Sequence, residues 1–82
     1  MISCDHYDYI EIVCLFKYPV ELTMKSGEII AGKALDTVRN PLNEECIKLQ
    51  VENDEVAVVL DAIKQLHVLV ENPHFETVSF EG

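Results

Sequence analysis

The fold of this chain is decided by residues 18–37, which read YPVELTMKSGEIIAGKALDT. Over residues 18–25 apolar and polar side chains alternate, which indicates a strand with one buried face. Gly27 then supplies a turn, because glycine tolerates a positive φ. The chain continues as a second strand over about residues 28–37, with Gly32 in its interior. A glycine in that position is typical of a bulge or of the sharp bend that a small barrel needs at its corners.

The rest of the chain continues this β pattern in short segments. Residues 46–52 alternate, and residues 56–60 form an apolar run that we expect to be buried on both sides or to lie near a barrel seam. Residues 63–70 predict a fifth strand, and residues 73–82 form either a tail or a sixth strand over 75–80. Short strands joined by tight turns predict a mainly β fold, a small antiparallel barrel or sandwich.

The first 17 residues fit a helix better than a strand, although Ile10 to Phe16 are rich in β-branched residues that also suit a strand. Asp5 and Asp8 are spaced as in a capping box, and Pro19 would end the segment. We therefore predict an amino-terminal helix over about residues 5–16. On a helical projection two faces separate: His6, Tyr7, Ile10, Val13 and Cys14 share one, and Asp5, Asp8 and Glu11 share the other.

Length and charge restrict the function. A chain of 82 residues has room for one domain, which we expect to span residues 1–82, with the barrel over about 18–71. Six Lys and Arg against 15 Asp and Glu give a net charge of -9, which disfavours direct binding of nucleic acid or of anionic membranes. The natural complement is a basic protein surface, although acidity can also serve solubility alone.

Cofactor and catalytic chemistry are not indicated. Cys4, Cys14 and Cys46 are an odd count without a CxxC pair, so we expect reduced thiols and a cytoplasmic location. Their spacing, even with the histidines, matches no structural zinc site, and we expect no metal and no other cofactor. His67 follows Leu66 in a strand and is expected to be a strand-face residue rather than a base. No catalytic motif is present, so we expect neither an enzyme nor a small-molecule substrate.

A partner-binding surface is the better hypothesis. Tyr9 and Ile12 project between the carboxylates of the predicted helix, so the charges could orient a partner while Tyr9 anchors it. The alternative is that Tyr9 and Ile12 pack under the carboxy-terminal tail. Asp36 and Asn40 flank a bend similar to the RNA-binding loop of Sm-like proteins, but a polar loop that caps its own backbone suits the charge better.

The segments discussed above resemble the Rof family, the Rho-binding antiterminators. The resemblance rests on residues 2–11 (ISCDHYDYIE), on residues 20–28 (VELTMKSGE) and on residues 31–36 (AGKALD). It implies a helix packed on an Sm-like β-barrel or sandwich, and a partner that is the hexameric termination factor Rho. By position it carries a binding role onto Asp5, Tyr7, Asp8 and Glu11. His6 departs from the family's pattern.

The hypothesis is therefore competitive occlusion, in which the protein binds beside the primary RNA-binding sites of Rho and keeps RNA off them, giving antitermination. The expected partner-binding residues are Asp5, His6, Tyr7, Asp8, Tyr9, Glu11, Ile12, Arg39 and Asn40. Two alternatives stay open: a small Sm-like RNA-binding module, and an acidic adaptor of another basic protein.

Overall fold

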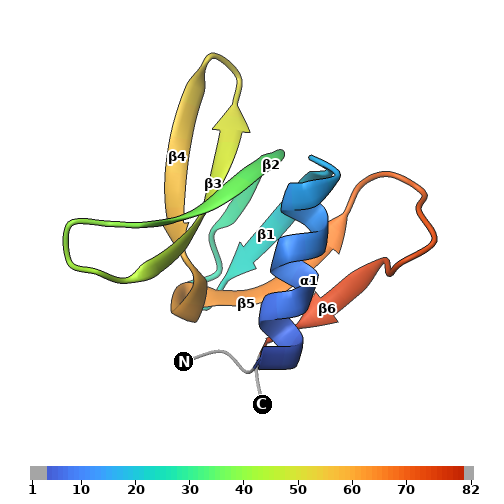
Figure 1. Ribbon diagram of the computed structural model, residues 1–82, viewed down its shortest axis with the longest axis horizontal. Coiled ribbons are helices and arrows are strands. Elements are labelled where there is room, and N and C mark those ends of the chain that lie inside the picture. The colour runs from blue at the N-terminus through green and yellow to red at the C-terminus, as the bar shows by residue number, and fades with distance from the viewer. Residues whose placement is uncertain (1–3, 81–82) are drawn as a thin grey trace.

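A computed structural model shows one helix followed by six strands (Figure 1). It describes residues 4–80, and the side chains of residues 6–80. The elements are α1 (Cys4–Leu15), β1 (Pro19–Met24), β2 (Ile29–Arg39), β3 (Glu45–Val51), β4 (Asp54–Val59), the 3₁₀ turn η1 (Leu60–Ala62), β5 (Ile63–Val68) and β6 (Thr77–Ser79). The predicted fold class, mainly β with one amino-terminal helix, is therefore confirmed.

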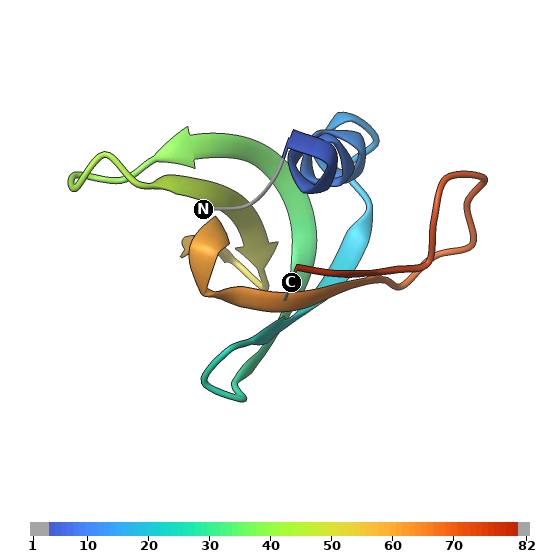
Figure 2. The same cartoon turned by 90° about the horizontal axis from the view of Figure 1, so that it is seen from below.

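All six strands belong to one antiparallel sheet in the order β4-β3-β2-β1-β5-β6. The sheet curls strongly around its core, and the long strand β2 follows that curve (Figure 2). Gly32 lies where β2 pairs with Val20 of β1. A Cβ atom at Gly32 would lie 2.7 Å from the carbonyl oxygen of Gln50, so only glycine lets β2 and β3 approach this closely.

A β-bulge interrupts β2 shortly after Gly32. Ala34 pairs with Leu49 and Asp36 pairs with Lys48, so Leu35 is the extra residue in the ladder. A bulge changes the direction in which neighbouring side chains point. Here it falls in the part of β2 that lies beside α1.

The core is formed by alternate residues of the strands and one face of α1. Ile10 and Val13 of α1 are fully buried against Val20 and Leu22 of β1 and the other core side chains. Val78 and Phe80 close the core from the carboxy-terminal side. The helix starts at Cys4, so Asp5 lies inside its first turn rather than at its N-cap. Helix α1 packs chiefly against β2 (Figure 2).

Three sequence expectations about the later strands need correction. The run 56–60 is not buried on both sides, because β4 is an edge strand in which Val56 and Ala57 are exposed. Strand β5 ends at Val68, and Leu69 and Val70 are exposed in the loop that follows. The sixth strand has three residues rather than six. In residues 4–80 the structure contains no helix long and apolar enough to cross a membrane.

Candidate partner-binding surface

Two carboxylates of α1 are exposed to solvent on the side of the helix that borders β2. Asp8 and Glu11 are exposed, and their spacing of three residues puts them on the same side of the helix. Asp5 belongs to the same helix by its backbone, but its side chain lies outside the described residues. Since neither Asp8 nor Glu11 takes part in an ion pair within residues 6–80, their charges face solvent.

The aromatic residues of α1 contact the protein's own core instead of projecting from it. Tyr7 is half-buried against the core, in line with the helical projection. Tyr9 also packs against the core, with its ring edge-to-face on Phe75 at a centroid distance of 4.7 Å. His6 makes a similar contact with Phe80 at 5.1 Å. The orientation predicted for Tyr9 is therefore wrong, because Tyr9 packs under the carboxy-terminal segment. The alternative holds for Tyr9 but not for Ile12, which lies beside β2.

A groove of about 710 Å³ runs between α1 and the bulged part of β2. It is lined by Asp8, Glu11, Ile12, Cys14 and Leu15 from α1, by Lys17, and by Leu35, Asp36 and Thr37 from β2. Ile12 is half-buried in this groove, whereas Leu15 is 74% exposed at its rim. At one side the Lys17 ammonium donates a hydrogen bond to the carbonyl oxygen of Leu35, 3.3 Å away. The groove thus combines an apolar lining with three carboxylates.

The pKa of the Cys14 thiol reflects the charges that surround this groove. Burial raises the pKa of Cys14 from 9.0 to about 11, and the negative charge of Asp36 acts in the same direction. Lys17 opposes this effect, and Glu11 adds to it. Both carboxylates therefore lie close enough to the groove wall to influence one buried group. The thiol itself is protonated at neutral pH and is a poor nucleophile.

The loop between β2 and β3 is organised by Asn40. Its side-chain oxygen accepts hydrogen bonds from the backbone N–H groups of Leu42 and Glu44, at 3.0 and 2.9 Å. Its amide group donates to the Glu44 carboxylate at 2.8 Å. Asn40 thus caps the backbone of its own loop. This was the interpretation preferred over an RNA-binding loop because the protein is acidic. Arg39 is likewise engaged, because its guanidinium donates to the carbonyl oxygen of Asn43 and pairs with Glu45.

A smaller hollow connects this loop to the helix. Its lining joins Tyr7 of α1 to Arg39 and Glu45 at the ends of β2 and β3, and Thr37 belongs to both this hollow and the groove. The structure thus brings together Tyr7, Asp8, Glu11, Ile12 and Arg39 of the predicted partner-binding set on neighbouring surfaces. Leu15, Lys17, Leu35 and Asp36 also belong here, and the sequence analysis did not assign them to this surface.

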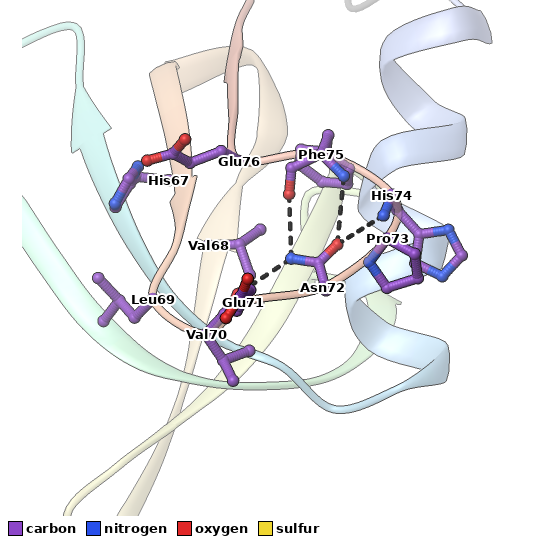
Figure 3. Close-up of a pocket in the computed structure, with 10 residues that line it drawn as sticks. All are labelled: His67, Val68, Leu69, Val70, Glu71, Asn72, Pro73, His74, Phe75 and Glu76. Atoms are coloured by element: carbon purple, nitrogen blue, oxygen red, sulfur yellow. Dashed lines mark hydrogen bonds between the residues drawn. The ribbon is translucent and has the colours of Figure 1, made fainter.

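A second cavity, of about 510 Å³, lies inside the loop between β5 and β6 (Figure 3). Asn72 is the centre of that loop: its amide donates to the carbonyl oxygens of Val70 and Phe75, and its oxygen accepts from two backbone N–H groups. At the base of the loop His67 Nδ1 and the Thr77 hydroxyl are 2.8 Å apart, so His67 is a strand-face residue as predicted. These polar groups are occupied by the loop's own hydrogen bonds, which indicates a structural role.

Outside the groove, Phe16 and His74 form an exposed aromatic stack beside Tyr18, with ring centroids of Phe16 and His74 5.0 Å apart. Cys46, like Cys14, is buried, as the sequence predicted. Within residues 6–80 no three His, Cys, Asp or Glu side chains are grouped so that they could hold a metal ion.

Comparison with known proteins identifies the family. A family model described as "Modulator of Rho-dependent transcription termination (ROF)" matches residues 1–80. The chain is also 47% identical to a solved structure described as "YaeO bound to Magnesium from Vibrio cholerae O395". That match has a TM-score of 0.88 and covers 92% of this chain and 97% of the other. No curated protein matches the chain. The resemblance seen in the sequence is confirmed: the chain belongs to the ROF family of modulators of Rho-dependent transcription termination.

Proposed function

We propose that this protein is a cytoplasmic inhibitor of Rho that binds the hexamer beside its primary RNA-binding sites. It would block RNA loading there and so allow transcription to continue past Rho-dependent terminators. The protein would act by occupying a surface, without catalysis, a cofactor or a small-molecule substrate. Rho would be its direct partner, and the protein would itself bind neither nucleic acid nor membrane.

One observation carries this proposal: α1 exposes the carboxylates of Asp8 and Glu11, and neither forms an ion pair with another residue of the described range 6–80. A protein that neutralises RNA phosphates must present Lys and Arg, so an acidic surface is complementary to the same face of Rho. The net charge of -9 supports association at long range. The groove that these carboxylates help to line supplies apolar contact area in addition to charge.

The loop between β2 and β3 extends this surface. Tyr7 and Arg39 line the same small hollow, and Thr37 joins that hollow to the groove. Arg39 and Asn40 are held by hydrogen bonds within the loop, so the loop would meet Rho in a preformed shape. In this proposal Asp5, His6 and Tyr9 support the surface, and Tyr9 does so from within by packing on Phe75.

The proposal is tested by measuring the affinity of the purified protein for hexameric Rho at several salt concentrations. We expect fast association that weakens as salt rises, because the contact is between opposite charges. Asp8→Lys and Glu11→Lys should each weaken binding by about tenfold or more while leaving the melting temperature unchanged, since like charges would then face each other. Glu28→Lys, an equal charge change on an exposed acid of the β1–β2 turn, should have a much smaller effect.

The competing hypothesis, an RNA-binding module, is tested in the absence of Rho. Direct binding of single-stranded RNA at physiological salt would support it. The structure gives it little support, because Asn40 uses its side-chain oxygen and amide within its own loop. Capture of a basic protein other than Rho from a bacterial lysate, without any affinity for purified Rho, would instead support the adaptor hypothesis.

A further inference from the structure

The groove between α1 and β2 has features of a binding site for one type of side chain. Two different elements form its walls: Glu11 lies on α1, and Asp36 lies on β2 just after the bulge at Leu35. Its lining includes the apolar side chains of Ile12, Leu15 and Leu35. A ligand that fits this combination needs an apolar stem and a positively charged end.

Among residues 6–80 no ion pair includes a carboxylate of the groove. The ion pairs among residues 6–80 join Arg39 to Glu45 and Lys48 to Glu55. Lys48 is the register partner of Asp36, yet its ammonium pairs with Glu55 at 3.5 Å. The groove's own cation, Lys17, donates to the carbonyl oxygen of Leu35. Within residues 6–80 the hydrogen bond that Asp36 accepts comes from the backbone N–H of Thr37.

Leu15 supplies a second argument. A leucine that is 74% exposed at the rim of a groove contributes apolar surface that a partner would bury. The methylene stem of arginine can cover such a surface while its guanidinium stays with carboxylates. Arginine suits two carboxylates on opposite walls better than lysine does, because its planar group presents several donors in fixed directions.

We propose that this groove receives an arginine side chain from a basic partner protein, with the guanidinium between Glu11 and Asp36 and the stem along Ile12, Leu15 and Leu35. The proposal rests on the function proposed above in taking Rho as the source of that arginine. It adds Asp36 and the bulge of β2 to a surface that the helix and the loop around Arg39 and Asn40 were expected to form. The bulge would then serve recognition by turning Leu35 and Asp36 toward α1.

The first test does not involve Rho. N-acetyl-arginine amide is titrated into the ¹⁵N-labelled protein, and its neutral counterpart N-acetyl-citrulline amide serves as the control ligand. We expect saturable amide shifts at Ile12, Leu15 and residues 35–37 with arginine, and at least about threefold smaller shifts with citrulline, because the charge-assisted contacts are lost. Asp36→Asn should remove this difference, whereas Glu28→Gln, the same charge loss elsewhere, should keep it. Equal shifts with both ligands, or equal shifts in Asp36→Asn and the parent, would overturn the proposal.

The second test measures affinity for purified Rho. Asp36→Asn should weaken binding by about tenfold, and Glu28→Gln by less than about twofold. If Asp36→Asn binds Rho as tightly as the parent while Asp8→Lys does not, the arginine groove is wrong and the proposed inhibition of Rho stands. If arginine binds the groove as expected but the parent does not bind Rho, the groove stands and the proposed function fails.

Discussion

The substitution Tyr9→Ala distinguishes two roles for Tyr9: a residue that stabilises the fold, or an anchor that binds a partner. In the structure its ring is half-buried and packs edge-to-face on Phe75. Exposing about 75–125 Å² of ring surface costs about 2–3 kcal/mol, and the aromatic pair contributes about 1 kcal/mol more. Alanine returns about 0.7 kcal/mol through its higher helix propensity. The free energy of unfolding should therefore fall by about 2–3 kcal/mol, from a total of about 4–12 kcal/mol for a chain of this length.

The assay for this prediction is thermal unfolding followed by circular dichroism. A loss of about 2–3 kcal/mol should lower the melting temperature by about 10–20 °C in a domain of this size. Tyr9→Phe keeps the ring and should melt within a few degrees of the parent, and Asp8→Ala, one residue away and exposed, should do the same. In a double-mutant cycle with Phe75→Ala, the coupling should be about 1 kcal/mol.

The opposite outcome would refute this reasoning. If Tyr9→Ala melts with the parent and instead weakens binding to Rho about 30-fold, Tyr9 is a partner anchor and its contact with Phe75 contributes nothing to stability. Thirtyfold corresponds to about 2 kcal/mol, the size expected of an interface anchor.

Three further predictions concern the sheet, the thiol and the loop. Gly32→Ala should destabilise the protein by about 1–3 kcal/mol in urea unfolding, because its Cβ would meet the Gln50 carbonyl oxygen at 2.7 Å, whereas Ala31→Ser on the exposed face should be neutral. Cys14, with a pKa of about 11, should resist alkylation at pH 7.5 until the protein is unfolded. The pKa of this thiol is higher in the folded protein than in the unfolded chain. Its contribution to the free energy of unfolding is therefore complete below about pH 9 and should decline as the pH rises toward 11. Rapid alkylation of the native protein would contradict this. Asn40→Ala removes the acceptor of two backbone N–H groups and should speed hydrogen exchange in residues 40–45 without unfolding the sheet, a result that unchanged exchange would exclude.

The strands of the sheet could be predicted because the features that indicate them, alternation and turn residues, are local in the sequence. Alternation over residues 18–25 fixed which side chains of β1 face the core, and Gly32 marked the bend in β2. Burial of the apolar run at 56–60 on both sides, one of the two expectations for it, was wrong for the same reason: alternation and apolarity do not tell an edge strand from a central one. Only the pairing order, which depends on the whole chain, places β4 at the edge.

The candidate site was predictable only in part. The carboxylates of Asp8 and Glu11 could be placed on one side of a helix from their spacing alone. Tyr9 could not be oriented in this way, since a helical projection contains no information about Phe75, which is 66 residues further along the chain. The β2 wall of the groove was missed because a bulge depends on the register between β2 and β3.

The central claim, that the acidic face of α1 keeps RNA off Rho, is tested most directly by competition. Hexameric Rho is loaded with fluorescently labelled single-stranded RNA, and displacement of the RNA is followed as the protein is added. The parent should displace the RNA, and the double variant Asp8→Lys, Glu11→Lys should displace it at least about tenfold less effectively. If the parent binds Rho while the RNA stays bound, or if the double variant competes as well as the parent, the account is wrong.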